Sequence, residues 1–271
     1  MRNYKLTLSY DGTRYLGWQR QGNTENTIQR KVEAVLSRLL DEEIHVAGCG
    51  RTDAGVHARM QVCTFLSGRA VSPEDLLSGL RRYLPEDIGA VSLEEAPTRF
   101  HARLSCVEKT YRYRIWRSPV PPVFERRYVF VDRDPLDLER MREAAKLLTG
   151  THNFASFSAD RTKKSTVRTL KSIDIVPRGP ELDLFFTGDG FLYRMVRILT
   201  GTLLEAGKGL KRPEEISAAL SRRDRSLAGF TAPAQGLILW DIQYEGDAHG
   251  RNYTTDPAGH AADGPVGPLS E

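Results

Sequence analysis

The chain has 271 residues, 40% of them hydrophobic and 27% charged, with 39 Lys and Arg against 35 Asp and Glu for a formal net charge of +4. That length can bury a substantial core. No apolar run approaches the roughly 18 residues of a membrane helix, so we expect a cytoplasmic protein without a membrane segment. The three cysteines are odd in number and form no C-x-x-C pair, which argues against a disulfide framework and a structural zinc site.

The N-terminal part of the chain predicts alternating strands and helices. The predicted strands cover residues 4–10, 44–47, 61–66 and 88–93, and the predicted helices cover 28–39 and 72–84. Asn26 and Gln29 form a capping-box pattern at the start of the first helix. Ser72 and Pro73 are typical of the first turn of the second helix. The resulting order is β-α-β-β-α-β.

The remainder of the chain predicts the same order again. Its predicted strands cover residues 109–116, 170–176, 182–187 and 237–244, and its predicted helices cover 138–148 and 192–203, with an extra short helix from residue 213. We therefore expect an α+β fold of two ferredoxin-like or RRM-like halves, 1–105 and 106–246, whose largely antiparallel sheets meet around a central cleft. Residues 247–271 are rich in Gly, Pro, Asp and Ala, and we expect them to form a disordered tail.

Basic residues recur in short clusters along the chain. The clusters are Arg112-Arg114, Arg126-Arg127, Arg161 to Arg168, Arg194-Arg197 and Arg222 to Arg225. A single cluster of this kind is usually a solvated surface, but a series of them is expected when one face follows a polyanion such as RNA.

The stretch from Gly48 to Ala58 reads GCGRTDAGVHA, a composition that fits neither a helix nor a strand. Its glycines permit backbone angles and close approaches that a side chain would prevent. Arg51 and Asp53 would share one face of an extended segment, where the guanidinium favours the ionised carboxylate. We therefore expect Asp53 to be charged and available as a nucleophile at neutral pH.

This stretch resembles the active-site segment of the TruA family of tRNA pseudouridine synthases. Further blocks follow in family order, so that the resemblance covers residues 4 to about 244: Tyr10-Asp11-Gly12, Gly17 to Arg20, Phe100 to Arg103, Lys109 to Tyr113, Phe191 to Arg197, and Thr231 to Ala234 before Gly236-Leu237. Cys49 and Cys106 replace small residues, Met60 replaces a glycine and Leu104 an aromatic residue. None of these departures touches the Asp, Arg or Tyr positions.

The resemblance implies a cofactor-free isomerase in which Asp53 is the catalytic nucleophile. Such an enzyme breaks the N1–C1′ bond of uridine and rejoins the base through C5, and the family acts as a homodimer on uridines 38, 39 and 40 in the anticodon stem-loop of tRNA. Because the uracil is retained, one carboxylate can suffice where a glycoside hydrolase needs two. Attack at C1′ and deprotonation at C2′ both stay open.

Other residues are assigned by their place in the same blocks. Tyr111 corresponds to the family's active-site tyrosine, and could stack on a flipped base or assist proton removal from C5. Arg51 is assigned to pairing with Asp53 and to holding the displaced base stack open. Arg197 lies on a helix with a buried face, and it could reach the same site and pair with Asp53. For His57 we expect a structural role or an RNA contact. Further RNA contacts are predicted for Arg161, Lys163, Lys164 and Arg194.

Two other functions fit part of the sequence. A non-catalytic RNA-binding protein would explain the predicted sheets and the basic clusters, but not an Arg-Thr-Asp sequence framed by glycines. A hydrolase with an aspartate nucleophile would explain Asp53, but the second acid or cluster of magnesium-binding carboxylates that it needs is not evident in the sequence.

Overall fold

The computed structural model describes residues 1–160, 162 and 165–246, and the first half of the chain has the predicted order of elements. These are β1 (Arg2–Tyr10), α1 (Ile28–Leu40), β2 (Ala47–Gly48), β3 (His57–Ser67), α2 (Pro73–Tyr83) and β4 (Ile88–Ala96). α2 begins as predicted, because the Ser72 side chain accepts a hydrogen bond from the backbone N–H of Asp75. α1 begins at the predicted Ile28, but the predicted cap was wrong by one residue: Thr27, not Asn26, is the N-cap and accepts from the backbone N–H of Arg30.

The second half contains the predicted long elements and several short ones. They are β5 (Cys106–Trp116), β6 (Phe130–Val131), α3 (Leu138–Leu148), β7 (Gly150–Asn153), β8 (Val167–Arg178), β9 (Glu181–Gly188), α4 (Met195–Gly207), α5 (Pro213–Arg222) and β10 (Leu237–Tyr244). Three short 3₁₀ helices, η1 (Ala155–Phe157), η2 (Arg225–Leu227) and η3 (Ala234–Gly236), complete the described elements. The sequence did not predict β6 and β7, because segments of two and four residues are too short to show a period.

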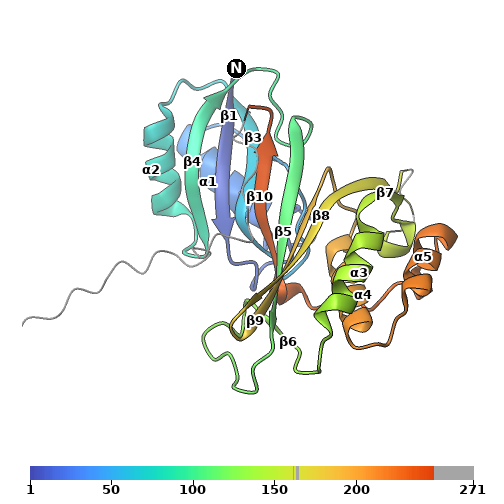
Figure 1. The fold of residues 1–271 in the computed structure, drawn as a ribbon. Coiled ribbons are helices and arrows are strands. Elements are labelled where there is room, and N and C mark those ends of the chain that lie inside the picture. The colour runs from blue at the N-terminus through green and yellow to red at the C-terminus, as the bar shows by residue number, and fades with distance from the viewer. Residues whose placement is uncertain (161, 163–164, 247–271) are drawn as a thin grey trace, which may run out of the picture.

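The strands of both halves form one ten-stranded sheet (Figure 1). The strand order is β4-β1-β3-β10-β5-β9-β8-β7, with β2 paired to β3 and β6 paired to β5. Among the described strands only β3 with β10 and β5 with β6 pair in parallel. The predicted α+β fold with largely antiparallel strands is confirmed, and the two sheets are joined edge to edge into one.

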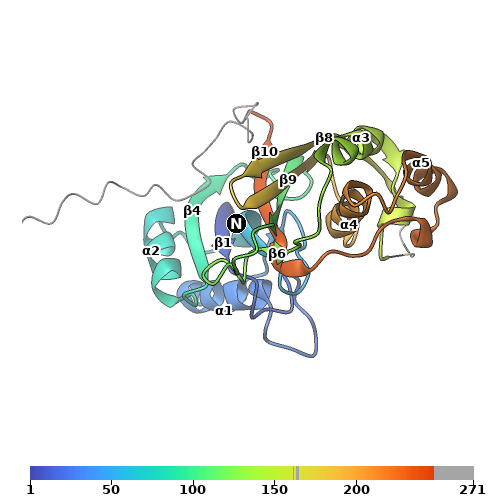
Figure 2. The same cartoon turned by 60° about the horizontal axis from the view of Figure 1, so that its bottom comes forward.

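The helices gather in two groups, one for each half of the sheet (Figures 1 and 2). α1 and α2 contact each other beside the first half, and α3 contacts both α4 and α5 beside the second. The apolar stripe of α1 is buried, with Ile28, Val32 and Leu36 fully enclosed. The boundary predicted near residue 105 falls between β4 and β5 and stays a prediction, and residues 247–271 lie outside the described part of the chain.

The junction between the halves lies next to the glycine-rich loop. β10 pairs in parallel with the start of β3, Ile238 opposite His57 and Leu239 opposite Ala58. On its other side β10 pairs with β5, and Leu239 lies opposite Tyr111. The sheet therefore places the strand that carries Tyr111 two strands away from β3, which begins four residues after Asp53.

Candidate functional site

The loop that carries Asp53 is fixed by the segment that follows β1. The hydroxyl of Tyr10 and that of Thr52 are hydrogen-bonded at 2.8 Å, and both residues are buried. The backbone N–H of Trp18 donates to the carbonyl of Thr52 at 3.1 Å. Gly17 has φ +95°, and a Cβ there would lie 2.6 Å from the Thr52 carbonyl oxygen. The residue before Asp53 is thus held by both its side chain and its carbonyl.

A buried amide holds the other end of this loop. Gln61 is fully buried on β3, its Nε2 donates to the carbonyl of Gly50 at 2.9 Å, and its Oε1 accepts from the Gly50 N–H at 3.3 Å. The Lys109 ammonium donates to the neighbouring Cys49 carbonyl at 2.9 Å. The sequence pattern did not indicate these two roles, although Lys109 and Gln61 both lie in strands that flank the predicted site.

The local structure requires glycine at some of the glycine positions of the loop and not at others. Gly48 packs on the indole of Trp18, where a Cβ would lie 2.5 Å from Nε1, and Gly55 has a left-handed φ of +76°. At Gly50 the nearest atom to a Cβ would be the Tyr111 hydroxyl at 3.6 Å, an ordinary contact. The expected need for glycine therefore holds at Gly48 and Gly55, but not at Gly50.

The Asp53 carboxylate pairs with Arg197 near the start of α4. Oδ2 lies 3.0 Å from Nη1 of Arg197, and the two side chains are 16% and 14% exposed. Nε of Arg197 donates to the Ala232 carbonyl at 2.7 Å, which orients the guanidinium. The ion pair is therefore largely shielded from solvent. The helix pattern had allowed this pairing, and the fold brings the two residues together across 144 positions of sequence.

The expected pairing of Arg51 with Asp53 was wrong. Arg51 is exposed, and within the described residues no ion pair or hydrogen bond joins its guanidinium to the carboxylate. The loop turns directly after Asp53, where the N–H of Val56 donates to the Asp53 carbonyl at 3.1 Å.

Tyr111 lies on β5 with its ring against Phe191. The ring centroids are 5.0 Å apart in an edge-to-face arrangement, and Tyr111 is 7% exposed. The Tyr111 hydroxyl makes no hydrogen bond with any described residue. Burial, followed by nearby negative charges that include Asp53, raises the pKa of this phenol above its ordinary value. At neutral pH the phenol is therefore protonated.

His57 is enclosed by protein. Its Nδ1 accepts from the Gly12 N–H at 3.1 Å and lies 3.1 Å from Asp11 Oδ1, and its Nε2 is 3.2 Å from the carbonyl of Arg127. The residue is 4% exposed, and burial lowers the pKa of the imidazole. These contacts favour the structural role, because a ring enclosed in this way presents no free nitrogen to RNA.

The predicted RNA contacts fall in two places. Arg194 is exposed at the N-cap of α4, has φ 60° and holds its guanidinium 4.9 Å from the ring centroid of Tyr193. Arg161, Lys163 and Lys164 lie outside the described residues.

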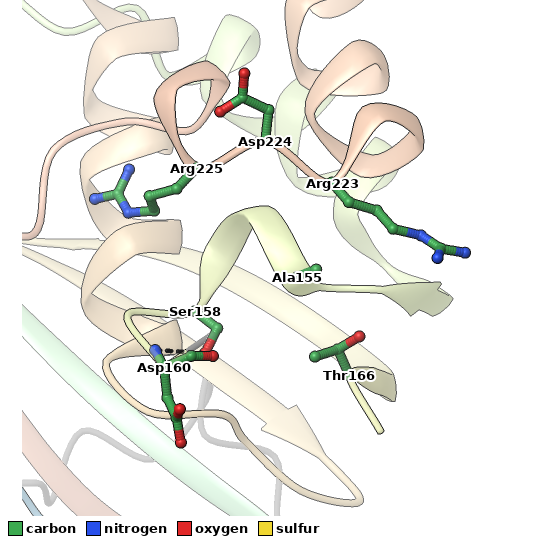
Figure 3. Close-up of a pocket in the computed structure, with 7 residues that line it drawn as sticks. All are labelled: Ala155, Ser158, Asp160, Thr166, Arg223, Asp224 and Arg225. Carbon is green, nitrogen blue, oxygen red and sulfur yellow. Dashed lines mark hydrogen bonds between the residues drawn. The ribbon is translucent and has the colours of Figure 1, made fainter. Parts of the chain in front are cut away.

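A separate pocket of about 440 Å³ lies in the second half of the molecule (Figure 3). Its lining residues are Ala155, Ser158, Asp160, Thr166, Arg223, Asp224 and Arg225. Asp53, Tyr111 and Arg197 do not line it. In Figure 3 the side chains of Arg223 and Arg225 point in opposite directions, so the two charges do not converge on one point.

Neither a metal site nor a membrane-spanning helix is found among the described residues. No group of three or more His, Cys, Asp or Glu side chains in that part of the chain could hold a metal ion. No helix found there is long and apolar enough to span a membrane.

Comparisons with known proteins show the family of the chain. A family model described as tRNA pseudouridine synthase matches residues 7–104 and 144–245. The chain is 44% identical over 245 residues to tRNA pseudouridine synthase A of Bacillus sp. (strain KSM-64), covering 90% of this chain and all of that protein. It is 42% identical over 245 residues to tRNA pseudouridine synthase A 2 of Clostridium tetani, covering 90% of this chain and 99% of that protein. The chain therefore belongs to the TruA family of tRNA pseudouridine synthases, isomerases that convert uridine in tRNA to pseudouridine.

Proposed function

We propose that Asp53 is the nucleophile of this isomerase and that its targets are uridines 38, 39 and 40 in the anticodon stem-loop of tRNA. The observation that carries the proposal is the shielded pair of Asp53 with Arg197. Only Oδ2 of the carboxylate is engaged by Arg197, and Oδ1 makes no hydrogen bond with the described residues. An ionised carboxylate with one oxygen fixed and one free can act on the sugar of a bound nucleotide.

The Asp53 carboxylate is the one group that breaking the glycosidic bond requires. Breaking the N1–C1′ bond leaves the uracil as an anion that stays in the site, so no second carboxyl group has to protonate a departing base. Oδ1 either bonds to C1′ or removes the proton from C2′, and both steps need the same free oxygen. The Arg197 guanidinium holds the carboxylate in place before the reaction.

We assign to Tyr111 the role of a platform for the flipped uracil. Its raised pKa makes the phenol a poor acceptor for the proton that leaves C5, because a protonated phenol must release its own proton before it can act as a strong base. The ring is held edge-on by Phe191, so its orientation is fixed before the base arrives. Stacking replaces part of the few kcal/mol that a flipped base loses.

The proposal also covers the residues that contact RNA, the oligomeric state and the cellular location of the enzyme. The exposed Arg51 and Arg194 are suited to phosphate or base contacts, and Arg161, Lys163 and Lys164 are proposed as further RNA contacts. The enzyme would act as a cytoplasmic homodimer and would need no cofactor. Because the phosphate contacts dominate affinity, log Kd for tRNA should rise linearly with log salt.

Tritium release from tRNA labelled at C5 of uridine tests the reaction, in buffer without metal or cofactor. We expect release with retention of the base. A non-catalytic RNA-binding protein would bind the tRNA without releasing tritium, and a hydrolase would liberate free uracil.

Three tRNA variants, each with uridine kept at only one of positions 38, 39 and 40, test the proposed target positions. Pseudouridine at some other position alone would contradict the proposed substrate and leave the reaction intact.

A further inference from the structure

The backbone of residues 228–232 holds the arginine that pairs with Asp53. The Ala232 carbonyl accepts from Nε of Arg197 at 2.7 Å, and the Ala232 N–H donates to the Arg197 carbonyl at 3.0 Å. The direction of the Arg197 guanidinium therefore depends on where this backbone runs.

Arg225 fixes the same backbone from its other side. Its Nη1 donates to the carbonyls of Gly229 at 2.9 Å and Ala228 at 3.4 Å, and its Nη2 donates to the hydroxyl of Thr231 at 3.1 Å. Its position is itself set by η2, where Asp224 caps the turn by accepting from the N–H of Ser226. A rigid fork of donors is suited to hold several acceptors at once, which a lysine ammonium would do with less defined geometry.

Helix α4 contacts the backbone of residues 228–232 on a further side. The Gly229 N–H donates to the Thr202 hydroxyl at 2.9 Å, and the Phe230 N–H donates to Glu205 Oε1 at 3.0 Å. A Cβ on Gly201 would lie 2.0 Å from the Phe230 carbonyl oxygen, so helix and backbone are in direct contact. Residues 228–232 thus lie between Arg225 and the helix that carries Arg197.

We propose that Arg225 is a positioning residue for the Arg197–Asp53 pair. It has no contact with Asp53, and it acts through the path Thr231, Ala232 and Arg197. When the three donors are removed, the backbone from 228 to 231 gains freedom, the Ala232 carbonyl loses its fixed place and the guanidinium turns away from the carboxylate. The catalytic consequence rests on the proposed role of Asp53, but the structural link does not.

The structural link is tested by ¹⁵N-arginine NMR of the unliganded protein. The Nε–H of Arg197 should exchange slowly with solvent in the parent, because it is part-buried and bonded at 2.7 Å. In Arg225→Ala that signal should broaden or exchange at least about tenfold faster, in the way local opening exposes an amide. Arg222→Ala is the matched control, because it removes the same charge from an exposed position at the end of α5.

The catalytic consequence is tested by steady-state kinetics on tRNA. Arg225→Ala should lower kcat by roughly 10- to 100-fold, the cost expected of a misplaced reacting group, with KM changed less than about threefold. Methylguanidine should restore part of kcat in Arg225→Ala and nothing in Arg197→Ala. Arg222→Ala should affect only KM, if it affects either constant.

Retention of slow Arg197 Nε–H exchange in a folded Arg225→Ala protein would overturn the proposal, whatever its activity. A fall in kcat with no change in that signal would do the same. If Arg225→Ala does not fold, Thr231→Val removes one of the three acceptors and should give a smaller change in both readouts, whereas no change in either would reject the path. Faster exchange in Arg225→Ala with kcat unaltered would support the structural link and count against the role of the pair in catalysis.

Discussion

The Asp53 loop and the start of α4 contribute to one site by different means. Around Asp53 the backbone is held by Thr52, Gly50 and their partners, and the carboxylate has no cation from its own loop. The start of α4 supplies the cation, Arg197, whose guanidinium is oriented by the backbone of Ala232. The loop thus fixes the position of the Asp53 carboxylate, and the helix supplies the positive charge of Arg197. Neither half of the chain contains both groups.

The largest effect should come from Asp53→Asn, which keeps the size of the side chain and removes its charge and nucleophilicity. We expect pseudouridine to fall below detection while tRNA binding and Tm stay near those of the parent. Mass spectrometry after carbodiimide labelling measures the product, with filter binding and thermal melting alongside. Substantial turnover in a well-folded Asp53→Asn protein would falsify the proposed mechanism.

Substitutions of Arg197 and Arg51 should have clearly different effects on kcat and on tRNA binding. Arg197→Ala removes the cation from a shielded carboxylate, and we expect kcat to fall by about 100-fold or more, in the range reported for lost electrostatic contacts at active sites. Arg51→Ala removes an exposed charge that does not contact Asp53, so its effect should be mainly a weaker tRNA Kd and a shallower salt dependence. Equal losses of kcat in the two variants would show that Arg51 reaches Asp53 once RNA is bound.

Substitutions of Tyr111 distinguish a stacking role of its ring from a proton-transfer role of its hydroxyl. Tyr111→Phe keeps the ring and its contact with Phe191, so we expect kcat within about threefold of the parent, whereas Tyr111→Ala should lose stacking worth about 1–3 kcal/mol, or roughly 5- to 150-fold in kcat/KM. Single-turnover rates with saturating enzyme measure the chemical step. A Phe variant as inactive as the Ala variant would instead assign the hydroxyl to proton transfer.

The smallest effect concerns His57, on the loop side of the site. Burial lowers its pKa below the ordinary value of about 6.5, so the unfolded chain binds a proton more readily than the folded one as pH falls. The free energy of unfolding should therefore decrease as pH falls from 7 through 6.5 and below. Urea melts across this range should show a flatter profile in His57→Asn and an unchanged profile in His45→Asn, whose side chain is exposed. Identical profiles in both variants would exclude His57 as the source.

The sequence predicted the elements well where local chemistry determines them. Strand β10 has the predicted bounds, residues 237–244, and α2 begins at the predicted Ser72 and Pro73. The cap of α1 was misplaced because Asn26 and Thr27 are both good N-cap residues and only the packed structure selects between them.

The partners of the site were harder to predict for a physical reason. Arg51 is two residues from Asp53, yet its side chain is exposed and makes no ion pair with the carboxylate in the described structure, while Arg197 meets the carboxylate because the sheet joins the two halves. The amide of Gln61 and the guanidinium of Arg225 hold backbone carbonyls, and carbonyls leave no pattern in a sequence. The identity of Asp53 could be inferred from its motif, but its surroundings depend on tertiary register.

The place of β10 has a consequence for how the enzyme matures during translation. This strand is the last described element of the chain, yet it lies at the centre of the sheet, between β3 and β5. A ribosome that has completed the first 200 residues has already made Asp53, Tyr111 and Arg197, but not the strand that joins their halves. The two halves should therefore not join into one sheet until residues 237–244 have been made and can pair with β3 and β5.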